Sequence, residues 1–560
     1  MRSVLKANLV VMGIFPAFLL GSTSLEKIEK AYREKKLTRE EYITLRVMAV
    51  VEPGNLPSEY RGEKPTEEPC GTKYLTEAFR EMGYSILTRP VLSGPEDTIF
   101  TLHFMVHYTT QGSDSTDPSY ASLVAAFAEF SWAYEVGYLG WDAPPPDYGY
   151  GGDDRYDIYI MSLESGVWGY TVPEKPGPDP YQEEATSYIV ISNDLSHDQA
   201  RITVAHELNH ACQLSYSYNE DSWWMENCAV WMEDVVYDDV NRYVEFFSSY
   251  PNPLSNPDRS ISCEEQLYEY AGGIWPAFLA EFYDLDVPRK AWEKQGIHHG
   301  NHTLSDLDFI LSEHYSSSLD EALREYGIWR YFTGPRHDPY HFSESYLWPP
   351  SFVLRSHHDY PDSGTGDPEP PDSRGGTNFI ELYPQGGALM LTFNGAEGCG
   401  WSVTLIGYRT GEPPREFPMN LHAGNAGCDS FPFSDFQYLL LVPTVTCWVD
   451  SGPDLLYSYF VDSIMQGEPD ISIYPDTVVI DVFYRSGRSW NIFSGTFNVK
   501  NWGSADLVYL KNFLFSAGPC PPSFWSSDVN GDGWVDYHDL IYLASYLYES
   551  GPEPVCQRGR

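Results

Sequence analysis

Residues 200–216 read ARITVAHELNHACQLSY, and their apolar side chains recur at intervals of three and four. This spacing predicts an amphipathic helix. His206 and His210 would lie one turn apart on that helix, so both imidazoles would project from the same side. Two imidazoles placed in this way can bind one tetrahedral Zn²⁺ ion, with Glu207 beside the metal rather than on it.

A catalytic zinc site needs one more protein ligand and one position for water. The metal lowers the pKa of that water to about 7, and Glu207 would take its proton and pass it to a leaving amine. The third ligand must come from the next helical run, WWMENCAVWMEDVV at 223–236, which contains Glu226 and Glu233 two turns apart. Periodicity does not choose between them, since either could ligate while the other orients an imidazole.

HELNH followed by WWMENCAVWMED resembles the gluzincin metallopeptidases, in which the glutamate of a W-x-x-E-G-x-A-like helix is the third zinc ligand. Asn227 stands where that pattern usually has glycine. A wider stretch, Phe104 to Trp275, is similar to a family of secreted bacterial zinc metallopeptidases and includes HYTTQGSD, GGDDRYDIYI and YAGGIWPAFL. The resemblance implies zinc on His206, His210 and Glu226, Glu207 as general base, Glu233 as a residue that orients a ligand, and Tyr270 as the donor that stabilises the oxyanion.

The chain carries a formal net charge of −45, from 80 acidic and 35 basic residues. Such a balance argues against nucleic acid or an anionic membrane as a partner. Arg2 and Lys6 precede an apolar run from Ala7 to Leu20 and then small residues, which is typical of a secretory signal peptide. We therefore expect a secreted, extracellular protein, either free or attached to the cell surface, that has no membrane span after signal cleavage.

Nine cysteines in an exported chain suggest disulfides, and the odd number leaves at least one thiol unpaired. Cys212 and Cys228 each follow an expected metal ligand by two residues. A disulfide between them and two buried free thiols are equally open interpretations.

The C-terminal region contains DVNGDGWVDYHD at 528–539, which fits a calcium-binding loop. DLVYLKNFL at 506–514 is repeated as DLIYLASYL at 539–547, and this duplication resembles a type I, EF-hand-like dockerin. The resemblance implies a cohesin-like scaffold or cell-surface partner; a structural calcium-bound tail is the alternative. The expected Ca²⁺ ligands are Asp528, Asn530, Asp532, Trp534 through its carbonyl, and Asp539.

The fold class expected is multidomain, with an α+β zincin-like domain, an all-β sandwich and a small helical calcium module. Within the first domain, the strand at 188–192 is expected at the sheet edge next to the metal, where it would bind an extended peptide. The segment 25–95 reads as a removable leader or as a packed helical segment. The expected parts are a signal peptide (1–24), the leader (25–95), the zincin-like domain (96–334), a linker (335–376), the sandwich (377–465), a second linker (466–494) and the dockerin-like module (495–560).

Together these features predict a secreted zinc endopeptidase that acts on a protein or peptide substrate and is tethered by its calcium-binding tail. A competing interpretation is a non-catalytic surface or scaffold-binding protein that retains the zincin fold. The intact Glu207 favours the enzyme.

Overall fold

The computed structural model forms two compact units, up to Asn219 and from Glu220 onward, which are described separately. Most of the expected signal peptide (1–21) and all of the expected calcium ligands lie outside the described residues. The structure describes residues 22–64, 68–83, 85, 87–163, 166–177, 182–297, 299–421, 425–448, 455–464, 477–486, 489–498 and 541–546.

The first unit is built on a five-stranded sheet in the order β1-β2-β3-β5-β4. The strands β2, β3 and β5 are parallel, whereas β1 and β4 run antiparallel to their neighbours. The prediction that the strand at 188–192 forms the edge is wrong, because β4 pairs with its outer side. The strands are β1 (Glu96–Phe100), β2 (Phe104–Thr109), β3 (Tyr156–Met161), β4 (Gly169–Pro176) and β5 (Ala185–Ser192).

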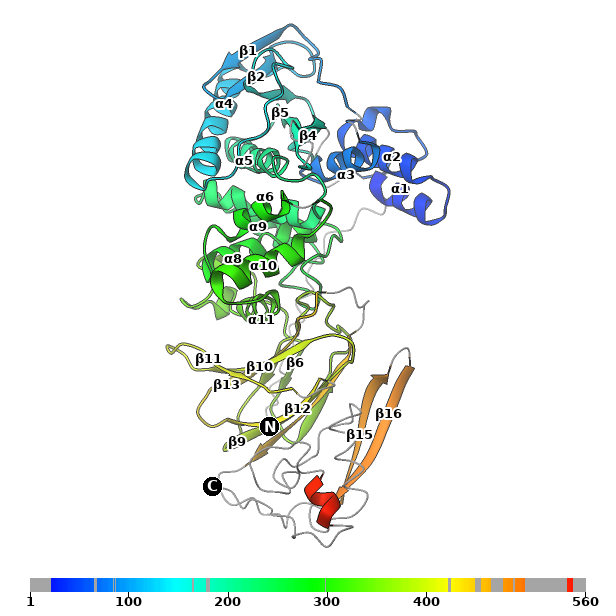
Figure 1. The fold of residues 1–560 in the computed structure, drawn as a ribbon, viewed down its shortest axis with the longest axis vertical. Coiled ribbons are helices and arrows are strands. Elements are labelled where there is room, and N and C mark those ends of the chain that lie inside the picture. Colours follow the sequence, from blue (N-terminus) through cyan, green and yellow to red (C-terminus); the bar gives the residue numbers. More distant parts are fainter. Residues whose placement is uncertain are drawn as a thin grey trace, which may run out of the picture. The chain divides into compact units, whose positions relative to one another are not determined.

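Helices cover both faces of this sheet (Figure 1). Side chains alternate between the faces of a strand. Tyr170 and Val172 of β4 share a core with α1, α2 and α3, while Thr171 between them reaches α5. On the α5 face, Phe104 of β2 also contacts Trp132 of α4. The helices are α1 (Ser24–Arg33), α2 (Arg39–Val51), α3 (Thr72–Met82), α4 (Pro118–Trp132), a π-helix (Ala133–Tyr138) and α5 (His197–Gln213), with a 3₁₀ turn at Pro53–Asn55.

The expected leader (25–95) is therefore a packed layer of the first unit in this conformation. Ile28, Val47 and Ala78, one from each of its helices, are at most 1% exposed. Whether this segment is removed in a mature form stays a prediction.

The second unit begins with helices and continues into β-sheets. The rings of Trp275, Phe278 and Tyr326 pack against one another inside the helical part. Its helices are α6 (Ser222–Val236), α7 (Tyr268–Ala271), α8 (Ile274–Phe282), α9 (Val287–Gln295), α10 (Thr303–Tyr315) and α11 (Leu319–Trp329), with 3₁₀ turns at Arg242–Ser248, Gly334–Arg336 and Ser345–Leu347.

Two sheets follow, in the orders β11-β10-β13-β8-β6 and β12-β9-β14-β7. Residues of both sheets, such as Leu405 of β10 and Leu391 of β9, share one apolar core, which makes a sandwich. The sheets consist of β6 (Arg355–His357), β7 (Asp362–Thr365), β8 (Ile380–Leu382), β9 (Ala388–Gly395), β10 (Trp401–Tyr408), β11 (Arg415–Pro418), β12 (Ala426–Pro432), β13 (Tyr438–Val445) and β14 (Tyr457–Ile464).

The structure differs from the expected linkers. Strands β6 and β7 lie within 335–376, and each is an edge strand of one sandwich sheet. Strand β15 (Thr477–Ser486) and most of β16 (Ser489–Asn498) lie within 466–494 or at its end, and the two form an antiparallel hairpin. The many Pro, Asp, His and Ser residues of 335–376 favour a linker, but the short strands β6 and β7 still pair along the backbone with β8 and β14. Of the expected dockerin-like module (495–560), the structure describes residues 495–498, which belong to β16, and residues 541–546, which are helical.

A disulfide joins Cys399 to Cys447 in the sandwich. Cys212 and Cys228 are both buried free thiols, so the disulfide considered between them is absent. The indole of Trp292 donates a hydrogen bond to the Cys228 sulfur at 3.5 Å.

Among the described residues, no helix combines the length and the apolar character needed to cross a membrane.

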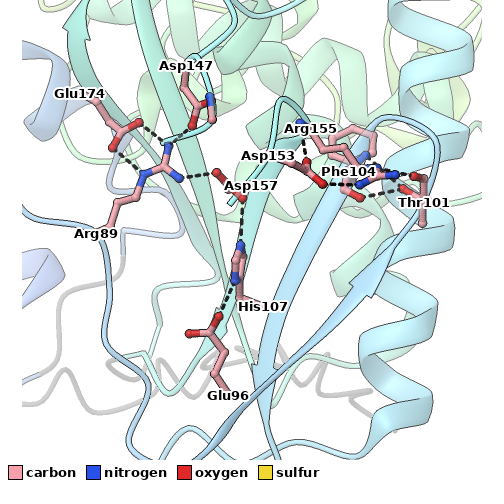
Figure 2. A network of polar contacts seen from close by, with 11 residues as sticks. Arg89, Glu96, Thr101, Phe104, His107, Asp147, Asp153, Arg155, Asp157 and Glu174 are labelled. Atoms are coloured by element: carbon pink, nitrogen blue, oxygen red, sulfur yellow. Dashed lines mark hydrogen bonds and ion pairs between the residues drawn. The ribbon is translucent and has the colours of Figure 1, made fainter. Parts of the chain in front are cut away.

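A network of charged side chains, buried except for Glu96, lies on the α1–α3 face of the first sheet (Figure 2). The Arg89 guanidinium donates to Glu174 at 2.7 and 2.8 Å, to Asp147 at 2.6 Å, and to Asp157. His107 then bridges Asp157 and Glu96, with both contacts at 2.8 Å. These six residues are called the Arg89 network below.

Candidate metal centre

Helix α5 carries His206, Glu207 and His210, as the periodicity predicts. A capping box fixes the start of the helix. The Ser196 hydroxyl accepts a hydrogen bond from the Gln199 backbone N–H, and the Gln199 side chain accepts one from the Ser196 backbone N–H. All three functional side chains are at most 2% exposed. A helix that places three polar groups in the interior needs partners for each of them.

The two histidines present their Nε2 atoms to each other at 3.1 Å. Gln213 explains which ring atom carries the proton on His210. The Gln213 amide donates to Asn209 Oδ1 at 2.8 Å, which leaves its oxygen to accept from His210 Nδ1 at 2.8 Å. The lone pair of His210 therefore lies on Nε2. Two nitrogens bound to one tetrahedral Zn²⁺ would be about 3.3 Å apart, so the observed separation fits a shared metal.

The hydrogen-bond chain behind His210 continues to Glu135 of the π-helix. Asn209 Nδ2 donates to Glu135 Oε2 at 3.3 Å, and Glu135 is fully buried. Burial raises the pKa of Glu135 well above its usual range, which favours the neutral acid. This chain of hydrogen bonds therefore holds His210 in one orientation.

Four buried side chains bring potential ligand atoms within 4.8 Å of one another: Cys70, His206, His210 and Glu226. Imidazole nitrogen, thiolate sulfur and carboxylate oxygen are the donors that Zn²⁺ takes in proteins. This group, called the metal cluster below, can hold a metal ion, and it contains the three ligands that the sequence predicts. Cys70 is an addition from the segment expected as a leader.

Glu207 is held by two threonine hydroxyls. Thr72 and Thr171 both donate to Oε2 of Glu207 at 2.9 Å, and the Thr171 backbone N–H donates to the Thr72 hydroxyl at 2.8 Å. The other oxygen, Oε1, is buried and has no hydrogen-bond partner in the described part of the chain. A carboxylate fixed through one oxygen presents the other to a proton donor that arrives later.

Gly169 permits the close approach of β4 to α5 that this arrangement requires. A Cβ at this position would lie 2.9 Å from Thr203 Cγ2 and 3.2 Å from Glu207 Cγ. Any larger residue would push the strand away from the helix and move Thr171 out of reach. Strand β4 begins at this glycine.

Asn227, the departure from the glycine of the resembled pattern, has a structural role in the second unit. Its side-chain amide donates to the backbone oxygen of Glu269 at 2.7 Å. Gly272 makes room for it, since a Cβ there would lie 2.5 Å from Asn227 Nδ2. The contact fixes α7, and with it Tyr270, beside α6.

Tyr270 and Glu233 are both buried, and their expected roles stay predictions. The Tyr270 ring packs against Phe246 with 5.3 Å between the ring centroids. Glu233 lies two turns beyond Glu226 in α6. The Nδ1 partner of His210 is Gln213 rather than a carboxylate, so Glu233 would have to orient His206 to fulfil its prediction.

Sequence reasoning missed the residues that come from far along the chain. Cys70, Thr72 and Thr171 carry no local pattern that would connect them to α5. Gln213 could have been predicted, because position 213 follows His210 by three residues on a helix and therefore shares its face.

In comparisons with known proteins, no family model matches the chain and no curated protein is significantly similar to it.

Proposed function

We propose that the chain is a secreted zinc-dependent endopeptidase that uses Glu207 as its general base. The observation that carries the proposal is the paired arrangement on α5: two imidazole nitrogens converge at 3.1 Å, and Glu207 beside them is fixed through Oε2 with Oε1 available. His206, His210 and Glu226 would hold the ion. This set has the donors of a catalytic zinc site, in which a further position serves water.

Bound zinc supplies a water molecule of lowered pKa and polarises the scissile carbonyl. The chain's residues do the rest. Glu207 takes the water proton on Oε1 and later donates it to the leaving amine, while Thr72 and Thr171 keep its carboxylate from rotating. Gln213 keeps the His210 lone pair on Nε2. Tyr270 would donate to the developing oxyanion.

For the C-terminal region, we propose a dockerin-like module that binds Ca²⁺ and tethers the enzyme to a scaffold or cell surface. The support is the ligand spacing at 528–539 and the internal repeat. The sandwich would then act as a spacer between the catalytic part and the tether.

A second candidate is a non-catalytic protein in which the metal has a structural role. Cys70 favours it, because four protein donors around zinc are typical of closed, structural sites. The two candidates differ in turnover rather than in metal content.

The test compares the wild-type chain with Glu207→Gln on an unfolded, fluorophore-labelled protein, each loaded with zinc and calcium. We expect kcat/KM to fall about 10²- to 10⁴-fold in the variant with zinc stoichiometry unchanged, and a chelator to abolish wild-type cleavage. Glu313→Gln, at an exposed position of α10, is the matched control and should leave cleavage unchanged. Equal cleavage by the Glu207 variant would contradict the proposal. So would absence of cleavage by both the wild type and a Cys70→Ser chain.

A further inference from the structure

Cys70 reaches the metal cluster because the residues around it pair with the start of β4. The Trp168 N–H donates to Pro69 O at 2.8 Å, and the Gly71 N–H donates to Gly169 O at 3.2 Å. These contacts form a parallel bridge between Cys70 and Gly169 on the open side of the edge strand. The segment 69–71 thus occupies backbone positions that an extended peptide would use on an edge strand.

The fit of this segment is close. A Cβ on Gly71 would lie 3.2 Å from Tyr170 Cβ and 3.4 Å from Val51 Cγ2, so glycine lets the chain run tightly along β4. Directly after it, Thr72 begins α3 and donates to Glu207. Cys70 is 2% exposed and Glu207 is fully buried. A polypeptide substrate therefore has no direct access to Glu207 in this conformation.

The set of potential ligands leaves one coordination position that the Cys70 thiol can take. His206, His210 and Glu226 make three ligands, and a tetrahedral Zn²⁺ has one further position, which water occupies in a catalytic site. The Cys70 sulfur lies within 4.8 Å of the other three donor atoms. Thiolate is a stronger zinc ligand than water, so it would hold this position.

We propose that Cys70 is the fourth metal ligand and that residues 69–71 occupy the substrate position on β4, so that this conformation is the latent form of the peptidase. The inference rests on the proposed function for its catalytic part, whereas the ligation of Cys70 stands on the donor geometry alone. Opening displaces 69–71 from β4. One water molecule then replaces the sulfur, and the released thiolate takes a proton from solvent.

Glu207, the proposed general base, keeps one of its hydrogen-bond donors after this opening. Thr72 would leave with the displaced segment, but Thr171 belongs to β4 and keeps its 2.9 Å contact with Glu207 Oε2. Glu207 thus has one hydroxyl donor that is tied to the closed state and one that is not. The arrangement couples substrate access to the loss of a metal ligand.

The first experiment measures ligation without reference to activity. The full chain is loaded with Co²⁺ and its near-ultraviolet spectrum is recorded, because a thiolate bound to Co²⁺ gives an intense charge-transfer band that nitrogen and oxygen ligands do not give. We expect the band in the wild type, its loss in Cys70→Ser and its retention in Cys263→Ser, the control at a free thiol in the second unit. A wild type that binds Co²⁺ without the band would overturn the proposal, even if the variant fails to fold.

The second experiment measures latency. With zinc loaded, Cys70→Ser should cleave the unfolded substrate at least about tenfold faster than the wild type, and Cys70→His, which restores a fourth donor, should return cleavage to the wild-type level. Glu207→Gln in the Cys70→Ser background should abolish it. If the band depends on Cys70 but Cys70→Ser and wild type cleave equally, the latency part is overturned while the peptidase stands. If the band depends on Cys70 and neither chain cleaves, the site is structural and the proposed function fails with the latency.

Discussion

The Arg89 network and the polar side chains of α5 lie on opposite faces of the same five-stranded sheet, and they differ in the kinds of group that they bring together. In the Arg89 network, a cation meets carboxylates: Arg89 donates to Asp147, Asp157 and Glu174. In the metal cluster, four potential metal ligands meet: two imidazoles, a thiol and a carboxylate.

The difference separates a structural arrangement from a candidate functional one. Within the Arg89 network the chain supplies both signs of charge, and each carboxylate has a hydrogen-bond partner in Arg89 or His107. The converging side chains of the metal cluster are instead of the donor types that bind a metal cation. Glu207 strengthens the contrast, because it is held through Oε2 while its buried Oε1 has no hydrogen-bond partner in the described residues.

Removing the cation of the Arg89 network gives the sharpest test of this contrast. Arg89→Met should lower the free energy of unfolding by about 3–5 kcal/mol, because Asp147, Asp157 and Glu174 would stay buried without their partner. Urea unfolding followed by tryptophan fluorescence measures the loss. Arg39→Met, which breaks ion pairs of a half-exposed arginine, should cost at most about 1 kcal/mol. Similar losses for both variants would show that the network is not structural.

On the other face, loss of the residue behind His210 should weaken metal binding rather than stability. Gln213→Leu removes the acceptor for His210 Nδ1, so the proton is no longer confined to that atom. We expect zinc affinity to fall about 10- to 100-fold, measured by competition with a chromophoric chelator. Gln213→Glu keeps an acceptor and should retain most of the affinity. An unchanged affinity in the leucine variant would mean that the imidazole is oriented by other contacts.

The part of the site that could be predicted from the sequence is the part that one helix contains. His206, Glu207 and His210 lie within five residues, so the helical period alone places them together, and the apolar stripe predicts the helix. Cys70, Thr72 and Thr171 join them through contacts that span more than 35 residues, and only the packing of β4 against α5 brings them near.

The fold shows the same limit. Strong periodicity predicts α5 and α6 well, but the edge position of β4 depends on pairing between strands that carry no mutual signal. The strands β6 and β7 are short, and a run of proline, aspartate and serine around them hides their pairing from a composition argument.

Thr171 tests whether the threonine contacts serve the base or the fold. Thr171→Val keeps the shape of the side chain and removes the hydroxyl, which lies 2.8 Å from the Glu207 backbone oxygen and 2.9 Å from Glu207 Oε2. We expect kcat/KM in the Cys70→Ser background to fall about tenfold, which corresponds to roughly 1.4 kcal/mol, while zinc affinity stays constant. Comparable loss of zinc affinity would mean that Thr171 acts by positioning the helix. Thr203→Val, which breaks a bond to the Gln199 backbone oxygen on the same helix, is the control and should leave kcat/KM near the background value.

His107 should give the smallest effect and the one that depends on pH. Burial alone would lower the pKa of His107, but hydrogen bonds to Asp157 and Glu96 outweigh it, so the pKa is raised above the usual value of about 6.5. A raised folded-state pKa means that the charged form stabilises the fold. This contribution is complete below about pH 6.5 and is lost as the pH rises through the folded pKa. Hence His107→Gln should cost more stability at pH 6 than at pH 9, whereas His314→Gln, exposed on α10, should show no such difference. Urea unfolding at the two pH values measures it. A cost that does not change with pH would show that His107 stays neutral between its two carboxylates, and that the charge balance of the network is set by Arg89 alone.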